Sequence, residues 1–150
     1  MKRVLISPNF WAYVKISEGC NNLCSYCTIP YIRGKLRSRR IEDIVKEVYS
    51  LVKNGAKEIN LISQDTTRYG EDIYGEPSLL ALLKELEKIK GDFYIRILYS
   101  YPIRITRDLV HFIKNSEKIV PYFEIPIQHV NDEILIRMNR NYTKEDIKRV

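Results

Sequence analysis

Strand-like and helix-like segments alternate along this chain, and that alternation constrains its fold more than any other feature. Strand patterns occupy residues 12–17, 58–63, 93–99 and 122–127. Apolar residues recur at helical spacing in the segments that follow, at residues 41–52, 79–89, 106–115 and 132–138. The sequence therefore predicts an α/β fold of βαβ units with a parallel sheet. Either an open doubly wound sheet or a complete or partial (β/α) barrel would satisfy this pattern.

The composition is that of one globular domain. The 150 residues are 45% hydrophobic and 29% charged, which is enough to bury a core and excludes a disordered segment. The apolar runs are far shorter than the roughly 20 residues that span a bilayer, and no signal peptide follows Met1. An odd number of cysteines argues against a secreted disulfide scaffold. We therefore expect a cytoplasmic protein with no membrane contact. The net charge of +6 permits an anionic partner without requiring one.

All the cysteines lie in one loop, directly after the first predicted strand. Cys20, Cys24 and Cys27 fall within eight residues at C-x3-C-x2-C spacing, which would let three thiolates converge on one metal centre. Scattered inert thiols would not cluster in this way, and a Cys24–Cys27 disulfide would leave Cys20 unexplained. A structural zinc needs four ligands, and His111 and His129 lie far along the chain. A [4Fe-4S] cluster fits better, because three thiolates hold three irons and leave the fourth open.

This motif, placed after the first strand of a βα repeat, resembles that of the radical S-adenosylmethionine (SAM) enzymes. The resemblance implies that the cysteines ligate the cluster and that the open iron binds the amino and carboxylate groups of SAM. It also implies one-electron cleavage of SAM to a 5′-deoxyadenosyl radical. The aromatic residue before the third cysteine, here Tyr26, is expected near the adenine. The fold implied is a partial (β/α) TIM-like barrel with about four βα units.

Further stretches resemble one branch of these enzymes, the methylthiotransferases. They are residues 16–21, 29–30, 33–34, 37–39, 64–67, 69–70, 99–102, 125–129 and 138–140. The pattern Gln-Asp-Thr-Thr-x-Tyr-Gly, at residues 64–70, is typical of the enzyme that methylthiolates an aspartate of a small-subunit ribosomal protein. The branch that acts on tRNA adenosine usually carries a sequence beginning Gly-Gln-Asn there. The resemblance implies methylthiolation of an aspartate β-carbon, with the tRNA enzyme as the alternative.

The resemblance also implies a larger protein and several partners. Residues 1–150 correspond to the radical SAM domain, in the N-terminal part of the barrel. Complete members of the branch add an N-terminal domain with a second [4Fe-4S] cluster and a C-terminal small β-barrel, and this sequence has neither. The implied partners are the ribosomal protein, free or on the ribosome, and an electron donor such as a flavodoxin or ferredoxin.

Polar residues at the predicted strand ends are the candidate contacts to SAM. Where many radical enzymes carry Gly-Gly-Glu, this chain has Ser-Gln-Asp, so Gln64 or Asp65 would accept hydrogen bonds from the SAM ammonium. Ser100 follows the third strand. We predict that these side chains line one pocket beneath the cysteine loop, with Tyr26 at its adenine end. Gln128 and His129, after the fourth strand, are predicted to line the same pocket, and Arg96 within the third strand is the remaining candidate.

Five basic residues lie close together after the cysteine loop: Arg33, Lys35, Arg37, Arg39 and Arg40. They would form a solvated charged loop, bind the substrate carboxylate, or contact ribosomal RNA, and the sequence leaves these alternatives open. If the cysteines and this basic run acted alone, the chain would be a metal-stabilised nucleic-acid-binding module rather than an enzyme.

Overall fold

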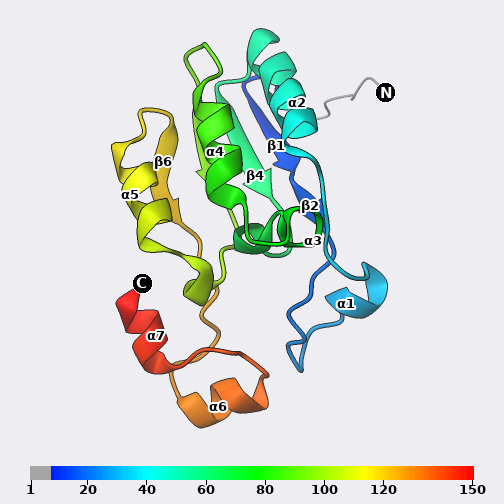
Figure 1. The fold of residues 1–150 in the computed structure, drawn as a ribbon, viewed down its shortest axis with the longest axis vertical. Helices are drawn as coiled ribbons and strands as arrows, with labels where there is room; N and C mark the ends of the chain where they lie inside the picture. Colours follow the sequence, from blue (N-terminus) through cyan, green and yellow to red (C-terminus); the bar gives the residue numbers. More distant parts are fainter. Residues whose placement is uncertain (1–7) are drawn as a thin grey trace.

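The computed structural model describes residues 8–150, and a parallel sheet of four strands forms its centre (Figure 1). The strands lie in the order β1-β4-β5-β6, and every neighbouring pair is parallel. Their bounds are β1 (Trp11–Lys15), β4 (Glu58–Ile62), β5 (Tyr94–Ile97) and β6 (Ile119–Phe123). The strand order follows the chain order, which confirms the predicted series of βα repeats.

The fourth strand lies earlier in the chain than predicted. The sequence pattern predicts residues 122–127, whereas β6 begins at Ile119 and ends at Phe123. The strand contains Pro121, which an edge strand tolerates, and its register against β5 shifts between Ile95 and Ile97. One further hydrogen bond, from the Ser100 N–H to the Glu124 carbonyl at 2.8 Å, joins the chain after β6 to the chain after β5. The residues beyond it form a wall of the cavity described below.

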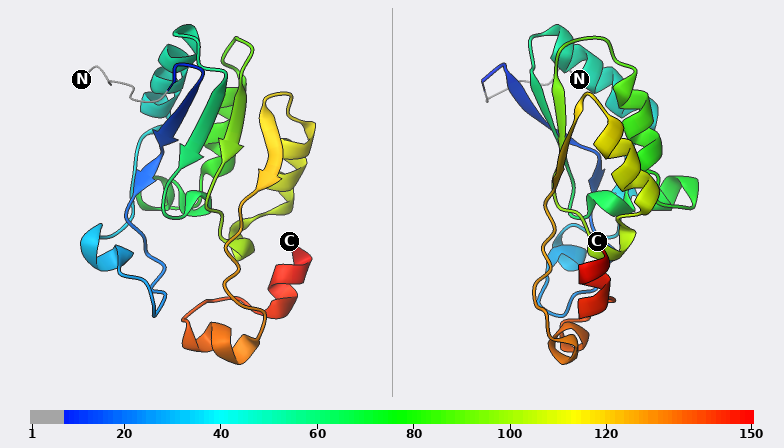
Figure 2. Two further views of the ribbon diagram at one scale, coloured as in Figure 1. Left: turned by 180° about the vertical axis from the view of Figure 1, so that it is seen from behind. Right: turned by 90° about the vertical axis from the view of Figure 1, so that its left-hand side faces the viewer.

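Three long helices cover one face of the sheet (Figure 2). They are α2 (Ile41–Lys53), α4 (Leu79–Glu87) and α5 (Arg107–Asn115). Alternation along β1 buries Ala12 and Val14 in the core beneath these helices and turns Tyr13 to the other face. Tyr13 pairs in register with Asn60, and Asn60 with Arg96, so these side chains share the second face. Helices on a single face, within residues 8–150, are the arrangement of part of a (β/α) barrel rather than of a doubly wound sheet.

The shorter elements gather at the carboxyl ends of the strands, toward the lower end of Figure 1. An antiparallel pair, β2 (Ser17–Glu18) with β3 (Arg37–Ser38), closes the base of the cysteine loop. The others are α1 (Ile29–Ile32), α3 (Glu71–Tyr74), α6 (Asp132–Arg137), α7 (Lys144–Arg149) and two 3-10 turns, η1 (Thr66–Arg68) and η2 (Pro102–Arg104). Across the described residues, no helix combines the length and apolar character needed to cross a membrane.

Gly19 lets the cysteine loop leave the sheet. Its φ is +79°, and a Cβ atom there would lie 2.2 Å from the carbonyl oxygen of Lys35. The neighbouring Cys20 N–H donates to the Gly34 carbonyl at 3.1 Å, which holds the two ends of the loop together. Because a side chain would clash in this left-handed conformation, only glycine fits here. Cys20, the first cysteine, is thereby held against residues 34–35, where the chain returns from the loop to the sheet.

We predict that Leu83→Ala lowers the free energy of unfolding by about 2–5 kcal/mol, because removing this buried side chain leaves a cavity. Leu83 is 0% exposed, in the core between α4 and the sheet. Lys84→Ala, on the exposed side of the same helix, is the matched control and should change stability by less than about 0.5 kcal/mol. Chemical denaturation of both variants measures the difference, and equal losses would contradict the orientation of α4.

Candidate functional site

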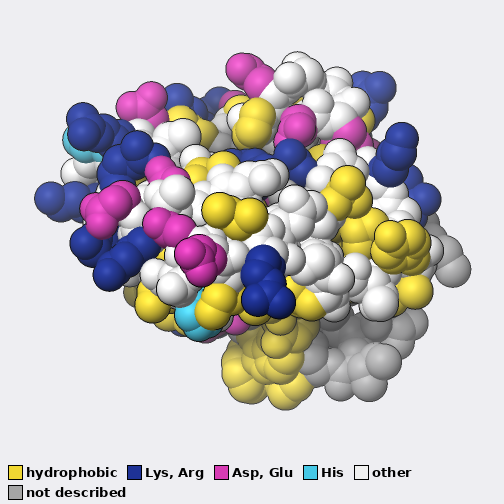
Figure 3. All heavy atoms as spheres, turned by 90° about the horizontal axis from the view of Figure 1, so that it is seen from below, with side chains coloured by type: hydrophobic (Ala, Val, Ile, Leu, Met, Phe, Trp, Pro, Cys, Tyr) yellow, Lys and Arg dark blue, Asp and Glu magenta, His cyan; other side chains and the backbone are white. Residues whose placement is uncertain are grey.

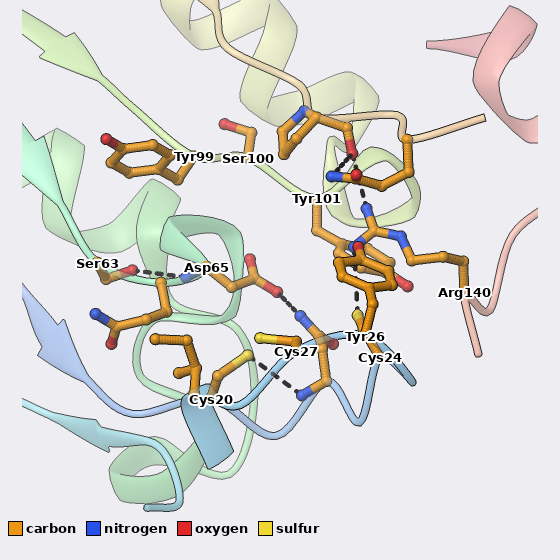
Figure 4. A pocket seen from close by; sticks show the side chains of 15 residues that line it. Cys20, Cys24, Tyr26, Cys27, Ser63, Asp65, Tyr99, Ser100, Tyr101 and Arg140 are labelled. Atoms are coloured by element: carbon orange, nitrogen blue, oxygen red, sulfur yellow. Dashed lines mark hydrogen bonds between the residues drawn. The ribbon is translucent and has the colours of Figure 1, made fainter. Parts of the chain in front are cut away.

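A cavity of about 430 Å³ lies at the carboxyl ends of the strands, between the sheet and the cysteine loop (Figure 4). Five separate stretches of the chain line it, and their cavity residues are Cys20, Asn22, Cys24, Tyr26, Cys27 and Ile29; Ser63, Gln64 and Asp65; Tyr99, Ser100 and Tyr101; Pro126 and Gln128; and Arg140. The cavity therefore combines thiols, amides, hydroxyls, a carboxylate and a guanidinium in one place.

Most of the residues predicted to share a pocket do so. Asp65, Ser100 and Gln128 all border the cavity, as do the three cysteines, Tyr26 and Gln64. The predicted pocket beneath the cysteine loop is therefore present. Parallel strands end at the same edge of a sheet, which is why residues far apart in the sequence meet there.

His129 does not border this cavity, contrary to the prediction that it would, and neither does Arg96, the remaining candidate for contact with SAM. Arg96 lies on the second face of the sheet, where its Nε donates to Glu58 Oε1 at 3.0 Å and its guanidinium stacks on Tyr122. Arg96 lies inside β5, where side chains alternate between the two faces of the sheet, so its side chain points to the second face and not to the cavity at the strand end. His129 Nδ1 accepts a hydrogen bond from the Asn131 N–H at 2.9 Å, so its ring serves the turn that precedes α6.

Asp65 connects the sheet to the cysteine loop. Its side chain is nearly fully buried, and its Oδ2 accepts hydrogen bonds from Asn22 Nδ2 at 2.6 Å and from Arg104 at 3.1 Å. Its Oδ1 accepts a hydrogen bond from the Thr67 hydroxyl at 2.6 Å. Because both oxygens are already occupied and Arg104 neutralises the charge, this carboxylate is engaged by the protein itself. Asn22 lies between the first two cysteines, so the network holds the loop at the end of β4.

Two buried polar atoms at the cavity have no hydrogen-bond partner among the described residues. They are Gln64 Oε1 and Ser100 Oγ. An unsatisfied buried acceptor costs free energy, and such groups in a native protein call for an explanation. Both side chains belong to the cavity wall, where a bound molecule carrying N–H or O–H groups would supply the missing partner.

The cysteine thiols are free and close to the protein interior. Cys20 and Cys24 are buried and Cys27 is half-buried. Burial raises the pKa of the Cys20 thiol, although the Asn22 N–H, which donates to its sulfur at 3.3 Å, acts in the opposite direction. A metal that binds the thiolate would reverse this penalty.

The spacing of these thiols bears on the type of metal centre. Within residues 8–150, no three His, Cys, Asp or Glu side chains are gathered closely enough to hold a single ion. A four-iron cluster makes no such demand, because each thiolate binds a different iron. The three free thiols that line one cavity are the kind of donors that hold a [4Fe-4S] cluster.

Arg140 is a cavity residue to which sequence reasoning assigned no role. It occurs within stretch 138–140 of the family resemblance, but no local pattern shows that it would return to the cysteine loop. Its Nη1 lies 3.4 Å from Cys24 Sγ and 3.4 Å from the Tyr26 hydroxyl. Burial alone would lower the pKa of Arg140, but hydrogen bonds to Cys24 and Tyr142 raise it above its usual value. Burial also raises the pKa of Tyr26 to about 12, so its hydroxyl remains protonated at neutral pH.

Backbone strain also gathers at this site. Three non-glycine residues of the described chain have positive φ: Tyr99 at 62°, Gln128 at 64° and Asn139 at 54°. Tyr99 and Gln128 line the cavity, and Asn139 donates from its side chain to the Leu23 carbonyl in the cysteine loop. Each such conformation costs about 1–3 kcal/mol and is typical of functional sites, where the surrounding contacts hold it in place.

The basic run is partly used within the fold. Arg33 pairs with Glu18 at 3.7 Å, and Arg39 pairs with Glu47 at 2.6 Å and donates to the Lys15 carbonyl. The other three members of the run are exposed. Figure 3 shows that Lys and Arg side chains on this end of the molecule are interspersed with Asp and Glu rather than gathered into one patch. Contact with RNA therefore stays a prediction.

Comparison with known proteins agrees with this arrangement of cysteines and strands. A sequence model of the Radical SAM superfamily matches residues 14–150. The chain belongs to the Radical SAM superfamily. The match includes the cysteine loop and every stretch that lines the cavity.

Solved structures confirm the partial barrel of the radical SAM type. The methyltransferase TsrM from Kitasatospora setae, solved with cobalamin and a [4Fe-4S] cluster bound, superposes with a TM-score of 0.73 at 16% identity. The alignment covers 93% of this chain and 26% of TsrM. The cobalamin-dependent SAM radical enzyme OxsB gives a TM-score of 0.68 at 14% identity, over 90% of this chain and 20% of OxsB. At such low identity the likeness concerns the fold alone.

Much closer relatives carry a more specific name. The "Ribosomal protein uS12 methylthiotransferase RimO" of Dictyoglomus thermophilum is 75% identical over 150 residues, which is all of this chain and 34% of the relative. A relative of the same name in Thermoanaerobacter sp. is 55% identical over 100% of this chain and 34% of the relative. Another, in Aquifex aeolicus, is 53% identical over 95% of this chain and 33% of the relative. The chain thus spans about a third of the length of these relatives.

We predict that Asp65→Asn lowers the free energy of unfolding by about 3 kcal/mol, because it removes a buried carboxylate and leaves the half-buried Arg104 without its anion. Asp92→Asn is the matched control, since Asp92 pairs with Lys57 on the surface and that pair is worth about 0–1 kcal/mol. Urea denaturation of the two variants gives the comparison. If Asp65→Asn were no more costly than the surface change, the anchoring role of Asp65 would be wrong.

Proposed function

We propose that this chain is the radical SAM domain of an enzyme that methylthiolates the β-carbon of an aspartate in ribosomal protein uS12. The observation that carries the proposal is the single cavity at which three free thiols meet two unpartnered acceptors. The substrate class rests on the names of relatives up to 75% identical. The Gln-Asp-Thr-Thr stretch at residues 64–67 supports the same branch.

In this proposal Cys20, Cys24 and Cys27 hold the cluster, which when bound supplies the electron for reductive cleavage of SAM. Gln64 Oε1 accepts a hydrogen bond from the SAM ammonium, because this oxygen is buried at the cavity and unpartnered. Asp65 is assigned to positioning the loop instead, since its oxygens are already used.

The other cavity residues would bind the nucleoside part of SAM. Ser100 Oγ lacks a partner, and Ser100 lies on the opposite side of the cavity from the cysteine loop (Figure 4). There it would contact a ribose hydroxyl. Gln128 reaches the same space from the chain after β6. Tyr26, from the loop itself, supplies an aromatic face for the adenine. A cavity enclosed in this way excludes water and so protects a reactive species from side reactions.

The rest of the activity is assigned to parts of the protein beyond this chain. We place a second cluster and a small β-barrel for the macromolecular substrate in the remaining two thirds of the relatives' length, as the family resemblance implies. The partners in this proposal are uS12, free or on the ribosome, and a flavodoxin or ferredoxin as electron donor. A cytoplasmic location follows from that substrate.

Anaerobic reconstitution of the full-length protein with iron and sulfide tests the proposal. We expect about four irons and four sulfides in this domain, 5′-deoxyadenosine from SAM, and a methylthio group on uS12 by mass spectrometry. Modification of tRNA adenosine instead of uS12 would overturn the substrate assignment. One bound zinc without sulfide would overturn the enzyme assignment in favour of a metal-stabilised binding module.

We predict that replacing any one of Cys20, Cys24 or Cys27 by Ala abolishes cluster-dependent formation of 5′-deoxyadenosine, because all three thiolates are needed while one iron stays open. Iron and sulfide analysis and chromatographic assay of the product measure the effect. Leu23→Ala is the control in the same loop, since the Leu23 side chain is 66% exposed and the substitution keeps its backbone carbonyl. A cysteine variant that formed the product at the unsubstituted rate would refute the ligand assignment.

We predict that Gln64→Ala raises the Kd for SAM about 10- to 100-fold, because a hydrogen bond to a charged group is worth about 1.5–3 kcal/mol. Gln64→Glu keeps an acceptor oxygen in the same place and should bind SAM at least as tightly as the unsubstituted protein. Equilibrium dialysis with the cluster-loaded protein measures both values. Equal affinities for the Ala and Glu variants would remove Gln64 from the proposed ammonium site.

A further inference from the structure

Arg140 occupies an unusual environment for a charged side chain. It is 7% exposed, and its guanidinium carbon lies 4.4 and 4.8 Å from the ring centroids of Tyr101 and Tyr142, two rings that are themselves in edge-to-face contact at 5.2 Å. The guanidinium carbon of Arg104 also lies over the Tyr101 ring, 4.6 Å from its centroid. A planar guanidinium held against aromatic rings has its orientation fixed, so the direction of each N–H group is defined.

Hydrogen bonds at two of its nitrogens aim the third at the cysteine loop. Nε donates to the Tyr142 hydroxyl at 2.8 Å, and Nη2 donates to the Pro126 carbonyl at 2.9 Å. With these nitrogens anchored, Nη1 points to Cys24 Sγ at 3.4 Å, next to the Tyr26 hydroxyl (Figure 4). The contact with sulfur is therefore a consequence of the whole arrangement and not of one flexible side chain.

The backbone around Arg140 is itself fastened to the cysteine loop. The Ser25 N–H donates to the Met138 carbonyl at 3.0 Å, and the Ser25 hydroxyl donates to the Arg137 carbonyl at 2.9 Å. The Asn139 amide donates to the Leu23 carbonyl. These contacts join segments more than 110 residues apart in the sequence. They fix the backbone of Arg140 relative to the backbone of Cys24, and so they limit the distance between the two side chains.

The positive charge of Arg140 lacks a carboxylate partner. Arg104, the other guanidinium on Tyr101, is paired with Asp65, whereas no ion pair to Arg140 occurs within residues 8–150. A buried unpaired cation is costly, so the site requires an anion next to this guanidinium. The sulfur of Cys24, as a thiolate, is the atom in contact that would supply it. The same charge would stabilise additional electron density on that sulfur.

We propose that Arg140 is a positioning residue that donates a hydrogen bond from Nη1 to Cys24 Sγ and thereby raises the reduction potential of the cluster. The inference rests on the proposed function, because it takes Cys24 as a cluster ligand. One-electron reduction adds negative charge to the cluster and its ligands, and hydrogen bonds to the sulfurs are among the factors that set such potentials. The electron comes from the low-potential donor of the proposed function.

The test is a potentiometric titration of the full-length, anaerobically reconstituted protein, followed by electron paramagnetic resonance (EPR). The signal that changes on addition of SAM identifies the cluster of this domain. In Arg140→Gln we expect the reduced-to-oxidised ratio at a fixed potential to fall about tenfold, which is 59 mV for a one-electron couple. Arg137→Gln removes the same charge from an exposed position on the adjacent turn and should leave the ratio unchanged.

A second measurement detects the contact in the unsubstituted protein, and a variant serves only to assign the signal to Arg140. Protein labelled with ¹⁵N-arginine should show a ¹⁵N hyperfine coupling to the reduced cluster by pulsed EPR, and Arg140→Lys should abolish it while keeping the charge. No coupling in the unsubstituted labelled protein would overturn the inference. So would a fully loaded Arg140→Gln protein with an unchanged potential, including the case in which only its Kd for SAM rises and Arg140 binds the SAM carboxylate.

The experiment separates the two proposals. A reconstituted protein that contains no four-iron cluster contradicts the proposed function itself. A protein that cleaves SAM and modifies uS12, but whose potential and ¹⁵N coupling are independent of Arg140, contradicts this inference alone.

Discussion

The carboxylate of Asp65 is the interaction on which the cysteine loop depends. Three donors from different parts of the chain converge on it: Asn22 from the loop, Thr67 after β4, and Arg104 after β5. Without this anion, Arg104 would be a half-buried unpaired charge and Asn22 would lose the contact that holds it to the sheet. The loop contains few regular elements, so its position comes from such side-chain contacts rather than from a ladder or a helix.

The loop is held from two opposite sides. On one side Asp65 binds Asn22, just after the first cysteine, and on the other the segment at residues 137–140 binds Leu23 and Ser25, on either side of the second. The sheet determines both attachments, because β4 ends beside the loop and the chain after β6 leads to α6. The (β/α) repeat thus does more than gather residues at one edge. It fixes a cysteine-bearing segment that has little structure of its own.

The sequence was most informative where the signals are local. Helical spacing predicts α2 and α5 closely, and alternation along residues 12–17 predicts β1 and its buried face. The cysteine spacing identifies the loop, and the strand ends identify Gln64, Ser100 and Gln128 as cavity residues. Each of these depends on a few neighbouring residues and on the general rule that chemistry lies at the carboxyl ends of parallel strands.

Sequence reasoning failed where a partner lies far along the chain or where a side chain has two possible directions. The sequence leaves open which face of the sheet Arg96 occupies, and it lies on the face away from the helices, paired with Glu58 on the adjacent strand. Asp65 has the right position and chemistry for an ammonium, yet Asn22 and Arg104 donate to its Oδ2 and Thr67 donates to its Oδ1. Arg140 gave no signal of its role, since its contact with Cys24 spans 116 residues. Both arginines stack on Tyr101, but only one is neutralised by a carboxylate. A single aromatic ring thus separates a guanidinium that anchors the loop from one whose charge is directed at a cysteine sulfur.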